Sequence, residues 1–255
     1  FDVSGVAKKV DVNMEYLLIP AIAFLAFVIK GMTGTGTSTV IVALCALVID
    51  PKMAVVFASF VNVFGGLMML RVDPVPLPYR YWIPIALTMI GGSFIGAFAL
   101  AYIDPKVFEL ILGFAFLCIS AYFVFVRVSN HALRDTVPSN ASAADLAVGA
   151  FAGFCGGFIA VNAPPLVYHF SKALNKRLLR RLLVIIFIPA AIAQSVTFYW
   201  NGLMTPEVMV FGLLTLPGMA AGIYLGNRLH GAISEQIFRY ILGGFLLVVS
   251  IKLML

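Results

Sequence analysis

Long apolar stretches alternate with short polar segments along the chain, and each apolar stretch is long enough to form a helix. Ten such stretches can be read: Tyr16–Lys30, Thr37–Ile49, Met53–Arg71, Tyr81–Ile103, Val107–Arg127, Leu146–Val161, Pro164–Lys172, Leu182–Trp200, Pro206–Asn227 and Ile237–Leu255. Most of them approach the length of about 20 apolar residues that is typical of a helix crossing a membrane. We therefore predict an all-α, polytopic membrane protein.

Two of these stretches in each half of the chain are too short to cross a membrane comfortably. Tyr16–Lys30 and Thr37–Ile49 would form helices of roughly 20 Å, against a hydrocarbon core of about 30 Å. After a polar linker, Leu146–Val161 and Pro164–Lys172 are again short, and three long stretches complete each half. The predicted domains are a polar segment at 1–15, a membrane repeat at 16–127, a cytoplasmic linker at 128–145 and a second membrane repeat at 146–255.

Short sequence matches indicate an internal duplication. GGSFIG at Gly91–Gly96 matches PGMAAG at Pro217–Gly222 with an offset of 126 residues, and FELILG at Phe108–Gly113 matches FRYILG at Phe238–Gly243 with an offset of 130. Matches that keep their order and nearly the same offset are typical of repeated units. Glycines at four-residue spacing also let membrane helices pack closely, which is their simpler structural role.

The number of crossings predicts how the two halves are oriented. Each short pair either forms a re-entrant hairpin, which leaves three crossings per half, or crosses twice, which makes five. Both numbers are odd, so the two halves have opposite orientations in the membrane. We therefore predict two inverted-topology repeats, each with a pair of short helices and three full spans, as in many secondary transporters.

The charged residues assign the sides of the membrane. The chain is only 11% charged and has a net charge of +6, which we attribute to the excess of Lys and Arg on the cytoplasmic side rather than to nucleic-acid binding. Of 17 Lys and Arg residues, eleven fall in the loops of one side: Arg71, Arg80, Arg127, Arg134, Lys172, Lys176, Arg177, Arg180, Arg181, Arg228 and Arg239. Five fall on the other side: Lys8, Lys9, Lys52, Lys106 and Lys252. Both termini are therefore predicted to lie outside.

Each half contains one polar break between its short helices. The first is KGMTGTGTSTV at Lys30–Val40, and the second is VNAPP at Val161–Pro165. Non-helical backbone at membrane depth persists only where it is buried in protein or lines a cavity, so the two breaks predict a site between the halves. We expect Thr37 and Ser38 to cap one short helix and Asn162 the other. Two helix N-termini that face each other would bind an anion through their N–H groups.

Several polar side chains near these breaks have two interpretations. Lys30 either binds substrate or extends its ammonium group to the cytoplasmic face, and His169 either binds an anion or a proton or is a hydrogen-bonded structural residue. Asn62 and Gln194 lie inside full spans, where hydrogen bonds between helices are the alternative to substrate contact. The predicted substrate-binding residues are Lys30, Gly34, Thr35, Gly36, Thr37, Ser38, Asn62, Asn162, Ala163, Pro164, His169 and Gln194.

Three segments resemble the TauE/SafE family, the sulfite exporter or toluene sulfonate uptake permease family. They are KGMTGTGTSTVIVAL, GFCGGFIAVNAPPLV and the C-terminal LPGMAAGIYLGNRLHGAISEQIFRYILGGFLLVVSIKL, and the resemblance covers about residues 16–255. It implies transport of small sulfur-containing or organic anions, often outward, with the substrate at the paired breaks. The chain departs from the glycine-rich pattern of that family at Thr35, Thr37 and Asn162–Ala163, which leaves the particular anion open.

The sequence thus predicts a secondary transporter, an exporter of sulfite or organosulfonates, in the lipid bilayer of a bacterial inner membrane. An anion channel on the same scaffold and a carrier of a non-sulfur organic anion remain alternatives. We predict no enzyme activity, no cofactor and no metal ion, because the chain has no zinc-type His-Glu-x-x-His motif and no paired intramembrane aspartates. The coupling ion, proton or sodium, and the formation of a homodimer are left open.

Overall fold

The computed structural model describes residues 18–32, 36–70, 75–125, 136–229 and 235–255, with only the backbone at 235–239. Over these residues the protein is helical and contains no strand. After an initial helix, Leu18–Met32, come α2 (Thr37–Cys45), α3 (Pro51–Met69), α4 (Tyr79–Tyr102), α5 (Pro105–Phe125), α6 (Ala143–Ile159), α7 (Ala163–Phe170), α8 (Lys176–Trp200), α9 (Pro206–Arg228) and α10 (Glu235–Met254). The ten predicted segments are confirmed, with most ends shifted by only a few residues.

Within the described ranges, five helices are long and apolar enough to cross a membrane, namely α3, α4, α5, α8 and α9. The initial helix and α6 are shorter, and α2 and α7 contain only 9 and 8 residues. An eight-residue helix rises about 12 Å, far less than the hydrocarbon thickness. The class predicted from hydropathy, a polytopic helical membrane protein, is therefore confirmed, and α2 and α7 are as short as expected.

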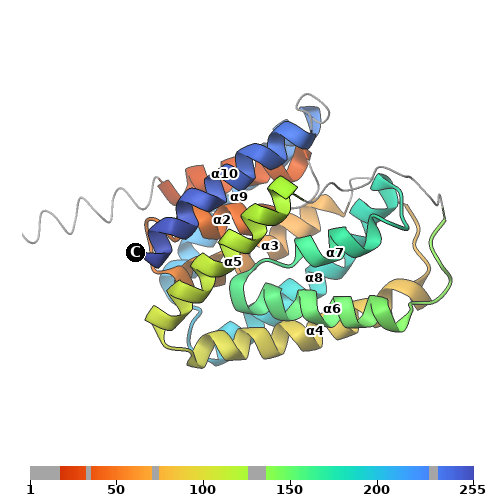
Figure 1. Cartoon of the computed structure of the whole chain (residues 1–255), viewed down its shortest axis with the longest axis horizontal. Coiled ribbons are helices and arrows are strands. Elements are labelled where there is room, and N and C mark those ends of the chain that lie inside the picture. Colours follow the sequence, from red (N-terminus) through yellow and green to blue (C-terminus); the bar gives the residue numbers. More distant parts are fainter. Residues whose placement is uncertain (1–17, 33–35, 71–74, 126–135, 230–234) are drawn as a thin grey trace, which may run out of the picture.

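Helices from the two halves of the chain pack on one another in matching pairs. In the first half α4 packs on α6, the first helix of the second half (Figure 1), and in the second half α9 packs on the initial helix. The third helices, α3 and α8, contact each other, and so do the last helices, α5 and α10. Each half therefore completes the packing of the other.

Glycines create the closest of these helix crossings. A Cβ atom built on Gly92 or Gly96 of α4 would overlap the backbone of α6, and one on Gly222 or Gly226 of α9 would collide with the backbone of the initial helix. The glycines of these contacts correspond at an offset of 130 residues, whereas the backbone atoms that they meet, at Ala150 and Phe154 and at Phe24 and Val28, correspond at an offset of 126. Both offsets found in the sequence, 126 and 130, therefore recur in these contacts, and the register of the repeats stays a prediction.

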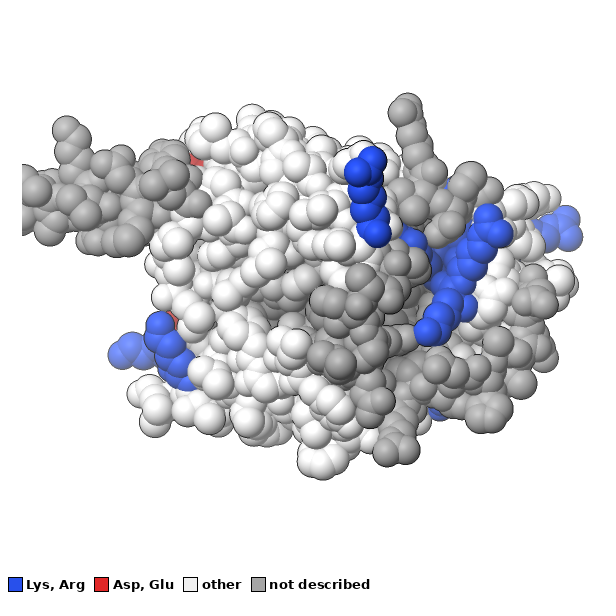
Figure 2. All heavy atoms as spheres, turned by 90° about the horizontal axis from the view of Figure 1, so that it is seen from above, with Lys and Arg blue, Asp and Glu red and all other residues white. Residues whose placement is uncertain are grey.

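The polar contacts between helix ends lie at two opposite ends of the molecule. At one end Lys52 donates to the carbonyl oxygen of Ile103, and Lys252 donates to that of Leu47 over 3.4 Å. At the other end Arg181 bonds to the chain that follows α3. In the face shown in Figure 2, the Lys and Arg side chains gather toward the right half and at the lower left, beside a wide uncharged surface. This distribution of charge is expected when the wide uncharged surface faces lipid.

Candidate functional site

The first break ends at a glycine with a backbone conformation that other residues rarely adopt. Gly36 has φ 85° and is the N-cap of α2, and no side chain caps that helix. The prediction that Thr37 and Ser38 are caps is therefore wrong, because the helix begins one residue earlier than a side-chain cap would require. Thr37 and Ser38 lie in the first turn instead, where backbone N–H groups have no partner within the helix. The predicted site residues Gly34 and Thr35 lie outside the described residues.

The second break has fewer free backbone N–H groups than the first. Asn162 is the N-cap of α7, as predicted, but its side chain makes no capping hydrogen bond. Pro164 and Pro165 occupy the first turn and lack an N–H, so only Ala163 can donate among the first three helical residues. The two helix ends are thus unequal, and α2 has more free backbone N–H groups in its first turn than α7. Just before this break Ala160 takes a left-handed conformation with φ 55°.

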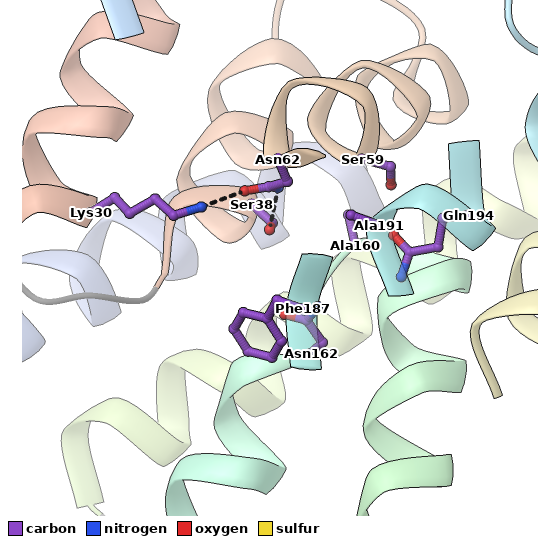
Figure 3. A pocket seen from close by; sticks show the side chains of 9 residues that line it. All are labelled: Lys30, Ser38, Ser59, Asn62, Ala160, Asn162, Phe187, Ala191 and Gln194. Carbon is purple, nitrogen blue, oxygen red and sulfur yellow. Dashed lines mark hydrogen bonds between the residues drawn. The ribbon is translucent and has the colours of Figure 1, made fainter. Parts of the chain in front are cut away.

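Both breaks open onto one small pocket (Figure 3). Its lining residues are Lys30, Ser38, Ser59, Asn62, Ala160, Asn162, Phe187, Ala191 and Gln194. They come from the end of the initial helix, from α2 and α3, from the second break and from α8. The structure therefore brings together five of the predicted residues from distant parts of the chain, namely Lys30, Ser38, Asn62, Asn162 and Gln194. Gly36, Thr37, Ala163 and Pro164 lie at the adjoining helix ends without lining the pocket.

The pocket is narrow in this conformation. Its volume is about 20 Å³. A cavity needs about 10–15 Å³ to accept a single water molecule, so this one has room for little more than a water-sized group.

Lys30 extends into the pocket rather than away from it. Its side chain is buried, with 6% of the residue exposed, and its Nζ donates to Oδ1 of Asn62 over 3.1 Å (Figure 3). The ammonium group also lies 5.3 Å from the centre of the Phe27 ring. Within the described ranges the salt bridge found is between His169 and Asp145, so Lys30 has no carboxylate partner there.

Asn62 connects Lys30 to the N-terminal turn of α2. Its Nδ2 donates to Oγ of Ser38 over 2.8 Å and to the carbonyl oxygen of Ala58 over 2.7 Å. Asn62 therefore makes the expected hydrogen bond between helices and also lines the pocket, and its contact with substrate stays a prediction. The chain of contacts from Lys30 through Asn62 to Ser38 fixes three donors on one wall.

Two buried hydroxyl groups near this wall have no hydrogen-bond partner among the residues that the structure describes. Oγ1 of Thr37 and Oγ of Ser59 are both enclosed, in residues that are 2% and 1% exposed. A buried hydroxyl without a partner costs about 1–3 kcal/mol, so such groups are uncommon unless something else binds them. Ser59 lines the pocket, one helical turn before Asn62.

The opposite wall is less polar. Phe187, Ala191 and Gln194 follow one another on a single face of α8. Nε2 of Gln194 donates to Oγ of Ser93 over 3.1 Å, which ties α8 to α4. Sequence reasoning missed Ser59, Ala160, Phe187 and Ala191. The helical spacing of Ser59 to Asn62, and of Phe187 and Ala191 to Gln194, is the signal that would have found three of them.

His169 is not part of this pocket. Its Nε2 lies 2.6 Å from Oδ1 of Asp145, the residue that forms a reciprocal cap with Ser142 at the start of α6. The structure therefore places His169 in the hydrogen-bonded structural role that was its alternative interpretation. The contact also joins the end of α7 to the start of α6, so these two helices form a hairpin that returns to the side from which it began.

Helices of membrane-spanning length that enclose a polar pocket between two helix breaks define a membrane transport protein. The family model "Sulfite exporter TauE/SafE" matches residues 19–253, and this chain belongs to that family of membrane transporters. The predicted resemblance is therefore confirmed over nearly the whole chain.

One curated relative is similar to less than half of the chain. The chain is 26% identical over 108 residues to a protein of Cupriavidus necator named "Probable sulfite/organosulfonate exporter TauE". That alignment spans 42% of this chain and 42% of the relative. No solved structure matches the chain.

Proposed function

We propose that this protein is a secondary transporter that exports small sulfur-containing anions, such as sulfite or an organosulfonate, through the pocket between the two breaks. The observation that carries the proposal is the buried ammonium group of Lys30. Among the described residues its hydrogen-bond partner is an amide oxygen and not a carboxylate. A cation inside a membrane protein is costly and is usually functional. An oxyanion would supply the missing negative charge.

The surrounding donors suit an anion with several oxygen atoms. The first turn of α2, with the unpartnered hydroxyl of Thr37, adjoins the pocket that Lys30 enters, and the unpartnered hydroxyl of Ser59 lines that pocket. A sulfite or sulfonate group has three oxygen atoms, each able to accept more than one hydrogen bond. The name of the Cupriavidus necator relative, a probable sulfite/organosulfonate exporter, agrees with this class of substrate.

The size of the pocket favours a carrier over a channel. A space of about 20 Å³ has room for little more than a water-sized group, so we infer that the walls separate when a sulfonate group binds. We infer that the anion binds when the pocket opens to one side, and that the pocket then closes before it opens to the other. Helices from the two halves pack in matching pairs, and the glycines at their crossings correspond at an offset of 130 residues. This arrangement supports inverted repeats as the parts that move during transport.

A thermal-shift screen of the purified protein tests this function. The anions are sulfite, sulfoacetate, isethionate, thiosulfate and carboxylate analogues, each compared with chloride at equal ionic strength. A ligand at 100 times its Kd stabilises a protein by about 2.7 kcal/mol, so a substrate anion should raise the melting temperature in a saturable manner. The proposal is contradicted if the sulfur-containing anions give no more shift than chloride.

We further propose that the chain lies in a bacterial inner membrane with both termini outside. Single cysteines at Lys106 and Leu255 are expected to react with a membrane-impermeant reagent from outside, and one at Arg177 only from inside. The reason is the excess of Lys and Arg in the loops that include Arg177. Labelling in intact cells and in inverted vesicles measures this, and the reverse pattern would refute the orientation.

A further inference from the structure

Arg180 fastens the start of α8 to two other helices. It lies in the second turn of α8, and its Nη2 donates to the carbonyl oxygen of Gly31 over 3.2 Å and to Oδ1 of Asn227 over 3.0 Å. Gly31 is at the end of the initial helix, where it crosses the end of α9 so closely that an added Cβ would lie 2.6 Å from the carbonyl oxygen of Ile223. One guanidinium group therefore holds three helix ends together.

Arg181, the next residue, fastens α8 to a different segment. Its Nη1 donates to the carbonyl oxygen of Leu70 over 2.7 Å, and its Nε donates to that of Val75 over 3.2 Å. Leu70 is the C-cap of α3. Carbonyl groups at a helix C-terminus lack partners within the helix and carry partial negative charge, so an arginine is a favourable partner for them.

These four hydrogen bonds lie beside the pocket and toward one end of the molecule. Gly31 directly follows Lys30, whose ammonium group enters the pocket. Along α8, Arg180 precedes the pocket residue Phe187 by two helical turns, or about 10 Å. Along α3, Leu70 follows Asn62 by a similar length. The bonded ends thus converge on the same side of the pocket.

Among the described residues, the polar contacts that join helix ends at the opposite end of the molecule come from lysines. There Lys252 reaches the carbonyl oxygen of Leu47 over 3.4 Å at an exposed position, and Lys52 contacts the carbonyl oxygen of Ile103. A lysine is a flexible point charge, whereas the planar fork of an arginine holds two acceptors in fixed directions. The side with the arginines is therefore the one held shut by directional bonds.

We propose that Arg180 and Arg181 form the gate that closes the pocket on the side where α8 begins. Opening on that side must break their hydrogen bonds to the ends of the initial helix, α3 and α9. The freed guanidinium groups then face the path of the anion, and such groups bind oxyanions through two parallel hydrogen bonds. An arriving anion thereby replaces the carbonyl oxygens that the arginines lose. This inference rests on the proposed transport function.

Access to a cysteine in the pocket tests the gate. The reporter is Ser59→Cys in a chain whose native Cys45, Cys118 and Cys155 are replaced, reconstituted in vesicles of known orientation. Arg180→Ala and Arg181→Ala are each expected to raise the labelling rate from the side where α8 begins by about tenfold, since each removes two charge-assisted hydrogen bonds. Labelling from the opposite side should not rise.

The matched control is Arg228→Ala, which removes a positive charge from the same end of the molecule. Its guanidinium group lies 4.6 Å from the ring of Tyr224 on its own helix. This variant should leave the labelling rate unchanged. If Arg228→Ala has the same effect as the two gate variants, or if the gate variants raise labelling equally from both sides, the gate is refuted.

A variant that strengthens the gate covers the case in which the alanine variants do not fold. Asn227→Asp replaces the amide acceptor of Arg180 with a carboxylate, so labelling from the arginine side should slow by several-fold. Unchanged or faster labelling in folded Asn227→Asp protein would overturn the inference. Labelling requires no substrate, so this result stands or fails separately from the anion screen that tests the proposed function.

Discussion

Replacing Lys30 with Gln is expected to weaken binding of the anion identified in the thermal-shift screen by about 100-fold. Removing one member of a buried, hydrogen-bonded charge pair costs about 2–5 kcal/mol, and each 1.4 kcal/mol is a factor of ten in Kd. Gln suits this test because its amide can still donate to Oδ1 of Asn62, the present partner of Lys30. The variant therefore removes the charge while it preserves a donor.

The measurement is a ligand titration of the melting temperature for the wild type and for two further variants. Lys106→Gln removes an exposed lysine and should leave the Kd unchanged. Lys30→Arg keeps the charge and should retain more affinity than Lys30→Gln, although the larger guanidinium group has little room in the pocket. An unchanged Kd in folded Lys30→Gln protein would remove this residue from the site and with it the main support for an anion as the substrate.

The helices of this protein could be predicted because local composition alone distinguishes a membrane helix from a loop. Each apolar stretch corresponds to a helix, and even the very short α7 can be recognised from the proline pair that opens it. The largest error is the start of α8, expected at Leu182 and found at Lys176. There the side chain of Asn175 caps a basic, amphipathic turn that hydropathy alone reads as loop.

The site was only partly predictable, because a pocket depends on which helix faces meet. Lys30 and Asn62 were identified as polar groups in apolar surroundings, a signal that is visible without a structure. Phe187 and Ala191 carry no polar group, and only their helical spacing to Gln194 distinguishes them from apolar residues of α8 that face lipid or a neighbouring helix. His169 looked functional for the same reason as Lys30, but it bonds to Asp145, 24 residues earlier in the chain.

The helix crossings explain why small residues recur where the two halves meet. At Gly92 an added Cβ would overlap the carbonyl oxygen of Ala150, and at Gly226 it would overlap that of Val28. Backbone atoms cannot move aside as a flexible side chain can, so the helices themselves would have to separate. A separation at Gly92 would loosen the packing of α6, whose C-terminal end leads into the second break.

Gly92→Ala is therefore expected to destabilise the protein by about 3 kcal/mol or more, the upper part of the range for overpacked cores. The adjacent Gly91 provides the matched control, since no atom lies within 4 Å of its added Cβ. Gly91→Ala should be neutral or slightly stabilising, because alanine favours the helix by up to about 1 kcal/mol. Thermal unfolding in detergent measures the difference, which should amount to about 6–12 °C in melting temperature.

Gly226→Ala extends the same test to the proposed repeats. If α9 crosses the initial helix as α4 crosses α6, Gly226→Ala and Gly96→Ala should each lower the melting temperature by a similar amount. Gly218→Ala should cost much less, because its added Cβ would lie 3.7 Å from the nearest side chain, an ordinary contact distance. A large drop in melting temperature for Gly218→Ala and none for Gly226→Ala would support equivalent glycines 126 residues apart. It would contradict an offset of 130 residues between them. The melting temperatures thereby decide which residues of the two halves are equivalent.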